Sequence, residues 1–213
     1  MTSKVVKCYF SPTQSTKSIV QAVSEGILGK TDSTAADFDL TLPSARGNWA
    51  AGIGVMGAED ALVLGFPVYA GRVPKIFLQE LKQLKGEGTP AVIIATYGNR
   101  AIDDAALEAA DVLGEQGFQV AGLVSFPCEH SFTVNVASGR PNSDDIKEAH
   151  KLGNQIAEKL GSVPLLQLRC QATGHMSSFP VATFARYTMR TCARNALRAP
   201  VCARQAQLTM IRA

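Results

Sequence analysis

The stretch CYFSPTQSTK, residues 8–17, is the most informative part of the chain. An apolar run ends there at Phe10 in a cluster of Ser and Thr residues, and an amphipathic pattern then continues to about residue 29. This order predicts a strand, a tight loop and the first turn of a helix. Because a helix start carries free N–H groups and the positive end of the helix dipole, such a loop is suited to binding an anion. The Gly-x-x-x-x-Gly-Lys pattern is missing, so neutral donors alone would hold a phosphate there.

Working outward from this stretch, apolar runs and helical patterns alternate through the first 160 residues. Continuous apolar runs, rather than alternating ones, are typical of strands that helices cover on both faces. The pattern therefore predicts an α/β fold, a doubly wound sheet of five parallel strands with its ligand site beyond their carboxyl ends. The strands are expected at about 4–10, 34–40, 61–66, 90–96 and 119–126, and the helices at about 14–29, 73–84, 101–116 and 143–160.

Two more loops at the expected carboxyl edge share a composition. GFPVYAGRVP at 65–74 and TYGNRAIDD at 96–104 each combine a Tyr with Gly residues. Gly lets the backbone approach a ligand closely, and Tyr offers a flat apolar face with a polar tip. Beside an anion site, these loops suit a flat aromatic ligand that carries a phosphate. Taken singly, the Ser and Thr residues are ordinary helix caps and the tyrosines half-buried loop residues, but the three loops together favour the ligand.

Together these loops resemble the flavodoxin family, and most closely the flavodoxin-like half of flavodoxin–ferredoxin fusion proteins. The resemblance implies the sheet order 2-1-3-4-5 and an FMN cofactor. It also implies electron transfer in which the flavin supplies the chemistry, with no catalytic side chain and no metal. It covers about residues 3–160 and runs through FSPTQSTK at 10–17, GFPVYAGRVP at 65–74, TYGNRAIDDA at 96–105, EHSFT at 129–133 and SGRPNSDDI at 138–146.

The resemblance also implies which residues bind FMN. The first loop would hold the 5′-phosphate, and the isoalloxazine ring would lie between the other two, with Tyr69 stacked on one face and Tyr97 over the second. Asp103 and Asp104 would place negative charge near the ring and disfavour the anionic hydroquinone. Gln14 stands where the family usually has Gly, and its side chain would either crowd the phosphate or donate an amide hydrogen bond to it. The expected contacts are Ser11, Thr13, Gln14, Ser15, Thr16, Pro67, Val68, Tyr69, Ala70, Gly71, Thr96, Tyr97, Gly98, Asn99 and Asp103.

Two other functions stay open at this stage. An FMN-dependent NAD(P)H:quinone-type oxidoreductase would need an open pocket over the flavin, where His130 and Phe132 contact the substrate. For His130 itself, a position in a loop near the cofactor rim is favoured over a role in acid–base chemistry. A flavodoxin-fold module that has lost its cofactor would fit the departure at Gln14. A tyrosine phosphatase is disfavoured, because the C-x5-R spacing counted from Cys8 places Gln14 where the phosphate-binding Arg is needed.

The charge is divided unevenly along the chain. Residues 1–160 contain 14 Lys and Arg against 18 Asp and Glu, a net charge of −4, whereas residues 161–213 contain seven Arg and no Lys, Asp or Glu. The overall charge of +3 thus comes from the tail and does not indicate nucleic-acid binding. The acidic part favours docking of a basic redox partner protein.

The tail at 161–213 does not continue the resemblance. A ferredoxin module contains C-x2-C-x2-C runs, whereas Cys170, Cys192 and Cys202 are scattered, so no iron–sulfur cluster is expected. The abrupt change in composition favours a reading-frame shift near residue 170 that replaced a ferredoxin module. A genuine Arg-rich tail with a helix at about 181–198 is the alternative. We expect a flavodoxin-like FMN-binding domain at 1–160 and a tail without a recognisable domain.

Composition also bears on where the protein works. The longest apolar run, residues 61–71, is about half the length that a membrane-spanning helix needs. No signal peptide is recognisable, and five cysteines without a C-x-x-C pair argue against a disulfide framework. We therefore expect a cytoplasmic protein without a membrane segment, and the oligomeric state stays open.

Overall fold

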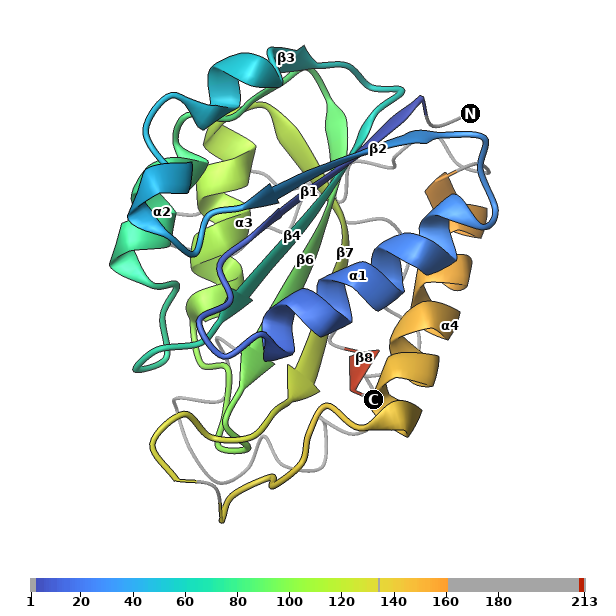
Figure 1. The fold of residues 1–213 in the computed structure, drawn as a ribbon. Helices are drawn as coiled ribbons and strands as arrows, with labels where there is room; N and C mark the ends of the chain where they lie inside the picture. The colour runs from blue at the N-terminus through green and yellow to red at the C-terminus, as the bar shows by residue number, and fades with distance from the viewer. Residues whose placement is uncertain (1–2, 134, 161–210, 213) are drawn as a thin grey trace, which may run out of the picture.

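The structure is a computed structural model that describes residues 3–133, 135–160 and 211–212 (Figure 1). The predictions for the tail concern its three cysteines, its helix at about 181–198 and its origin in a frame shift. All of them lie outside the described residues. Within those residues, no helix is long and apolar enough to cross a membrane.

Five long parallel strands form the centre of the fold, in the order β2-β1-β4-β6-β7. Numbered among themselves, these strands follow the predicted order 2-1-3-4-5, so the predicted flavodoxin-like α/β fold is confirmed. In chain order the main elements are β1 (Lys4–Tyr9), α1 (Ser15–Leu28), β2 (Thr34–Asp39), β4 (Ala61–Pro67), α2 (Lys75–Leu81), β6 (Thr89–Tyr97), α3 (Ala105–Glu115), β7 (Phe118–Pro127) and α4 (Ser143–Leu160).

Helices cover both faces of this sheet, α1 and α4 on one side and α2 and α3 on the other (Figure 1). Successive residues of a strand point to opposite faces. In β4, Leu62 and Leu64 therefore pack in the layer of α2 and α3, while Val63 packs in the layer of α1 and α4. All three side chains are fully buried. Burial on both faces explains why the central strands are continuous apolar runs.

Short elements absent from the sequence prediction fill the connection after β2. Two 3-10 turns, Pro43–Ala45 and Trp49–Gly52, precede β3 (Val55–Met56), which pairs with β5 (Lys85–Gly86) in a second, two-stranded sheet. A further short strand, β8 (Ile211–Arg212), pairs with the outer side of β7. Strands of two residues have no hydrophobic periodicity to reveal them.

Two helices are shorter than predicted. Helix α2 begins only after Pro74 and ends at Leu81, inside the predicted range of about 73–84. Helix α3 begins at Ala105, not near residue 101. Before it, Asn99 and Asp103 have φ values of 60° and 43°, which a right-handed helix does not contain. The loop after β6 is therefore longer than its apolar pattern indicated.

A glycine sets how closely α1 approaches the sheet. A Cβ atom at Gly65 in β4 would clash with the side chain of Val20 and lie 3.1 Å from Cγ2 of Thr16, both in α1. The missing side chain lets the first turn of α1 pack directly on the end of β4. The loop before α1 and the loop after β4 therefore lie together at one edge of the sheet.

Candidate functional site

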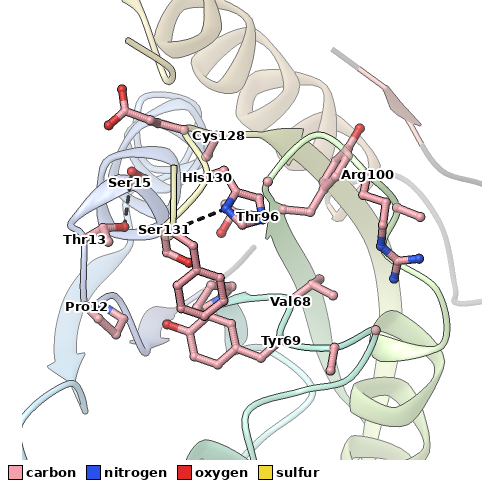
Figure 2. Close-up of a pocket in the computed structure, with 18 residues that line it drawn as sticks. Pro12, Thr13, Ser15, Val68, Tyr69, Thr96, Arg100, Cys128, His130 and Ser131 are labelled. Carbon is pink, nitrogen blue, oxygen red and sulfur yellow. Dashed lines mark hydrogen bonds between the residues drawn. The ribbon is translucent and has the colours of Figure 1, made fainter. Parts of the chain in front are cut away.

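A pocket of about 580 Å³ opens at the carboxyl ends of the central strands (Figure 2). Strand β1 has β2 on one side and β4 on the other, so the chain connections leave it in opposite directions. This is the switch point at which parallel α/β sheets bind ligands. The volume lies within the range of about 300–1,000 Å³ that is usual for small-molecule sites.

The pocket brings together ten of the fifteen residues that were expected to contact FMN: Thr13, Ser15, Pro67, Val68, Tyr69, Ala70, Gly71, Thr96, Tyr97 and Gly98. The other five, Ser11, Gln14, Thr16, Asn99 and Asp103, do not line it. The roles of all fifteen in FMN binding stay predictions. The lining also contains residues that were not assigned to the cofactor: Pro12, Arg100, Ala101, Cys128, Glu129, His130, Ser131 and Phe132.

Ser11 organises the first loop from a buried position. Its hydroxyl oxygen accepts the N–H of Lys17 at 2.9 Å, and its own N–H donates to Oγ1 of Thr41 at 2.9 Å. Its carbonyl oxygen accepts the N–H of Gln14 at 3.1 Å. The Ser11 hydroxyl therefore satisfies a free N–H of the first turn of α1 and holds the loop in shape, and Ser11 does not line the pocket.

Gln14 keeps the loop conformation for which glycine is suited. Its φ of 65° is left-handed, which costs a non-glycine residue about 1–2 kcal/mol. Its side-chain Nε2 donates to the carbonyl oxygen of Ser11 at 3.1 Å. The side chain is thereby held beside the loop and does not line the pocket. In this conformation it neither fills the pocket nor offers it an amide donor.

Unused donors remain at the start of α1. Within the described ranges, the N–H groups of Ser15 and Thr16 donate no hydrogen bond. The hydroxyls of Thr13 and Ser15 lie 3.5 Å apart beside the pocket. The nearby Nζ of Lys17 lies 3.6 Å from a carboxylate oxygen of Asp39 and does not line the pocket. These N–H groups and hydroxyls, at the positive end of a helix, can bind an anion with neutral donors.

Thr96 connects the first loop to the other two. Its hydroxyl lies 2.7 Å from the hydroxyl of Thr16, and both residues are only 2% exposed. The Thr96 hydroxyl also donates to the carbonyl oxygen of Phe66 at 3.4 Å. The backbone carbonyl oxygen of Thr96 accepts the N–H of Val68 at 2.7 Å. The Thr16 hydroxyl is therefore occupied within the protein, and its N–H is what it can offer a ligand.

The loop after β4 presents Tyr69 at the edge of a tight turn. Tyr69 and Arg72 exchange two backbone hydrogen bonds of 3.0 Å. Between them, Ala70 and Gly71 have φ values of 49° and 76°, as in a type I′ turn. Tyr69 is 40% exposed, its ring meets the ring of Phe10 edge-on at 6.4 Å, and burial raises the pKa of its phenol. The turn thus holds a flat aromatic face at the pocket wall.

The acidic residues expected near the ring have cations beside them. Asp103 forms an ion pair with Arg100, and Asp104 lies 3.8 Å from Nη1 of Arg72. Arg72 also pairs with Glu108 of α3 at 2.7 Å, which ties the loop after β4 to that helix. Figure 2 shows the guanidinium of Arg100 well apart from the ring of Tyr69. The negative charge that this region presents to the pocket is thereby reduced.

Residues 128–133 and 135–140 are here called the rim loop, and the first five of them, Cys128 to Phe132, line the far side of the pocket. His130 packs against Gly98, where any Cβ atom would clash with the imidazole ring. Its Nδ1 accepts the N–H of Phe132 at 3.1 Å, which leaves the proton of a neutral ring on Nε2. Phe132 is 94% exposed, and its ring centroid lies 5.7 Å from that of His130.

The base of the rim loop is fixed to the start of α4. Arg140 forms an ion pair with Asp145, which is 6% exposed. A carboxylate oxygen of Asp145 also accepts the N–H of Asn142 at 2.8 Å. The hydrogen bond from Arg140 is the main cause that lowers the pKa of Asp145. The rim loop therefore has an anchored base and an exposed tip at Phe132.

The two cysteines in the described part of the chain, Cys8 and Cys128, are poor nucleophiles. Burial raises the pKa of Cys8 well above its ordinary value, and burial together with the charge of Asp145 raises the pKa of Cys128 to about 12. Both are therefore thiols at neutral pH, which counts against the phosphatase interpretation. In the part of the chain that the structure describes, no group of three or more His, Cys, Asp or Glu residues could hold a metal ion.

Comparison with known proteins identifies relatives by fold. No protein-family model and no curated protein matches the chain. One solved structure that matches is a flavone reductase, with a TM-score of 0.55 and 11% identity over 75% of this chain and 63% of that one. Another is the apo form of an NADH:FMN oxidoreductase, EMOB, with a TM-score of 0.51 and 21% identity over 76% of this chain and 92% of that one. The Flv1 flavodiiron core from Synechocystis sp. PCC6803 also matches, with a TM-score of 0.51 and 16% identity over 74% of this chain and 36% of that one. This chain therefore spans about a third of that core. Identities this low establish the shared flavodoxin-like fold alone.

The bond between Thr16 and Thr96 can be tested by a double-mutant cycle. Thr96→Val should lower the free energy of unfolding by about 1–3 kcal/mol, because it leaves the buried hydroxyl of Thr16 unpaired. Thr16→Val should lower it by about 0.5–1.5 kcal/mol, because the hydroxyl of Thr96 keeps its bond to the carbonyl oxygen of Phe66. The double variant should lose less than the sum of the two, since both hydroxyls are then absent. Urea denaturation measures all four proteins. As a control, Thr13→Val should change stability by less than about 0.5 kcal/mol. Strictly additive losses would contradict the coupling.

The Arg140–Asp145 anchor predicts a pH dependence. Asp145→Asn should lower the free energy of unfolding at pH 7 by about 3 kcal/mol, because Arg140 loses its partner. Since the pKa of Asp145 is lower in the folded protein, its contribution is complete above about pH 4, the ordinary carboxyl pKa. This contribution is lost as the pH falls through the folded-state pKa of Asp145. The difference in the free energy of unfolding between the wild type and Asp145→Asn should therefore shrink in that pH range.

Chemical denaturation at several pH values between 7 and 3 measures this difference. Asp144→Asn is the matched control, because Asp144 is exposed and, among the described residues, its carboxylate pairs only with Lys147 one turn along the same helix. Its effect should stay below about 1 kcal/mol. A difference between the wild type and Asp145→Asn that does not change with pH would contradict this role of the carboxylate.

Proposed function

We propose that this protein binds FMN and carries electrons one or two at a time. The observation that carries the proposal is one pocket that joins unused anion donors at the start of α1 to the tyrosine-containing loops after β4 and β6. A phosphate and a flat aromatic ring are the two parts of FMN that such a pocket would hold. When bound, the flavin supplies the redox chemistry.

The residues present fit this cofactor. The N–H groups of Ser15 and Thr16 and the hydroxyls of Thr13 and Ser15 would bind the phosphate. Tyr69 and Tyr97 both line the pocket and would cover the ring. Backbone groups at 68–71 and 97–99 would bond its polar edge, and these loops would hold the ring in place and keep water from it.

The same geometry speaks against a module that has lost its cofactor. Such a loss was suggested by Gln14 in place of glycine. Gln14 takes the left-handed backbone conformation and bonds its amide to Ser11, so the loop keeps its shape and its donors. The proposal also includes a basic redox partner protein in the cytoplasm. The net charge of −4 over residues 1–160 supports docking of such a partner.

Comparison of FMN with riboflavin tests the phosphate site. We expect FMN to bind at least about 100-fold more tightly, because two or more hydrogen bonds to a charged group contribute about 1.5–3 kcal/mol each. Quenching of flavin fluorescence measures both affinities. A Thr13→Ala/Ser15→Ala variant should weaken FMN binding and leave riboflavin unchanged. Ser18→Ala is the control, because the Ser18 hydroxyl donates to the carbonyl oxygen of Gln14 and does not line the pocket.

Two results would contradict the proposal in different ways. Equal affinities for FMN and riboflavin would mean that the phosphate does not bind at the start of α1. Binding of neither flavin would favour the module without a cofactor.

A second candidate is an FMN-dependent NAD(P)H:quinone-type oxidoreductase. It is favoured by the rim loop, which places His130 and Phe132 at the pocket. However, the one Lys or Arg among the described lining residues is Arg100, and it is paired with Asp103. Among the described lining residues, no free cation is therefore left to hold the phosphates of a dinucleotide.

Steady-state assays separate the carrier from the oxidoreductase. With NADH or NADPH as reductant and a benzoquinone as acceptor, we expect the FMN-loaded protein to turn over no faster than free FMN at the same concentration. The rate should rise only when a separate flavodoxin reductase is added. Turnover that saturates with NADH or NADPH in the absence of a reductase would favour the oxidoreductase.

A further inference from the structure

We propose that Arg46, which does not line the pocket, supplies the positive charge of the phosphate site from just behind the loop that binds the phosphate. Its charge makes the site favour a flavin that carries a phosphate over one that does not. The inference rests on the proposed function, because it assigns a residue outside the pocket lining to the binding of FMN.

Arg46 has a fixed position beside the first loop, residues 11–16. Its Nε donates to the carbonyl oxygen of Leu40 at 2.8 Å, and its Nη2 donates to the carbonyl oxygen of Thr41 at 2.5 Å. The central carbon of its guanidinium lies 5.6 Å from the centre of the Phe10 ring, and Phe10 is the residue directly before this loop. Two hydrogen bonds and a cation–π contact thus hold the planar guanidinium in one place.

Thr41 connects this guanidinium to the first loop. The carbonyl oxygen of Thr41 accepts the hydrogen bond from Arg46, while its hydroxyl oxygen accepts the N–H of Ser11 at 2.9 Å. The hydroxyl of Ser11 in turn accepts the N–H of Lys17 in the first turn of α1. A chain of three hydrogen bonds therefore runs from Arg46 to the start of α1, where the unused anion donors lie.

The other charges beside the first loop cancel one another. Nζ of Lys17 lies 3.6 Å from one carboxylate oxygen of Asp39, and the second oxygen accepts the N–H of Thr41 at 3.1 Å. Arg46, by contrast, forms no ion pair with any described residue, and its Nη1 donates no hydrogen bond to one. Because an arginine side chain stays protonated in proteins, one net positive charge is left at this end of the pocket.

This charge supplies what the pocket lining lacks. A phosphate monoester carries about 1.5–2 negative charges at pH 7. Arg100 is the one Lys or Arg among the described lining residues, and it is paired with Asp103. Arg46 is half-buried, and charges in such positions are screened less than those at the surface. Its guanidinium therefore attracts a phosphate through space, while the donors of the lining make the direct contacts.

The flavin affinities of Arg46→Met test this role. Met keeps an unbranched apolar stem against Phe10 but carries no charge. We expect the variant to bind FMN about tenfold more weakly, and to bind uncharged riboflavin within about twofold of the wild type. Quenching of flavin fluorescence measures both affinities, and retained riboflavin binding shows that the variant is folded. An FMN affinity equal to that of the wild type would overturn the proposal.

Lys82→Met is the matched control for the loss of one positive charge. Lys82 is exposed, directly follows the last residue of α2 and does not line the pocket. Its replacement should leave the affinities for FMN and riboflavin unchanged. If Lys82→Met weakened FMN binding as much as Arg46→Met, the effect would come from the net charge of the protein, and the assignment to Arg46 would be wrong.

Two further measurements separate the charge of Arg46 from its hydrogen bonds. Arg46→Lys keeps the charge but loses the planar fork that binds two carbonyl oxygens, so it should bind FMN more tightly than Arg46→Met. Salt screens charges, so the difference in FMN affinity between the wild type and Arg46→Met should shrink between about 20 and about 500 mM sodium chloride. If Arg46→Lys is as weak as Arg46→Met and salt leaves the difference unchanged, Arg46 only braces the loop and the proposal fails.

The behaviour of the wild type separates this proposal from the proposed function. If the wild type binds neither flavin, or binds both equally, the proposed function fails and the role of Arg46 fails with it. If the wild type prefers FMN and Arg46→Met keeps the same preference, only the role of Arg46 fails.

Discussion

A buried hydrogen bond of 2.7 Å between the hydroxyls of Thr16 and Thr96 is the contact on which the pocket depends. It joins the first turn of α1 to the end of β6, and the backbone of Thr96 in turn bonds Val68 after β4. The anion donors and the two tyrosine-containing loops therefore have a fixed spacing. If this bond were lost, each loop would keep its own hydrogen bonds, but their distances from one another would be less constrained.

Backbone geometry supports the same arrangement. Gly65 admits α1 to the sheet, and Gly98 lets the ring of His130 rest on the loop after β6. The strained φ of Gln14 is balanced by the hydrogen bonds around Ser11. Ion pairs hold the periphery, with Arg72 on Glu108 and Arg140 on Asp145. The pocket itself is left with neutral donors and aromatic faces, and the one Lys or Arg among its described lining residues, Arg100, is paired with Asp103. This lining suits one bound phosphate and a neutral ring.

The fold could be predicted from the sequence because its signals are long. Runs such as the one in β4 are buried on both faces, and each continues for several residues between helical patterns. The position of the pocket followed from strand order and from the three loops. Side-chain roles were harder to predict, because a Ser or Thr can bond either a ligand or its own protein. Ser11 bonds the first turn of α1 and Thr16 bonds Thr96, and only the packing of α1 on the sheet decides this.

The contacts that hold the rim loop in place were also beyond sequence reasoning. His130 and Phe132 stood out as candidates for substrate contact, but their position at the pocket depends on contacts distant in sequence. The ring of His130 fits over Gly98, and the loop base is held by Asp145 of α4. Left-handed residues such as Asp103 likewise shortened α3, and no periodic pattern indicates them. What was missed is tertiary contact and local backbone conformation, while the periodic elements were recovered.

Amide chemical shifts recorded by two-dimensional nitrogen–proton NMR during a titration with FMN test the central claim most directly. The account predicts that FMN shifts the amides of Thr13, Ser15 and Thr16 together with those of residues 68–71 and 97–99. Inorganic phosphate should shift the first group alone, because it carries no ring. Shifts from FMN that avoid the start of α1, or that fall on another face of the sheet, would contradict the account.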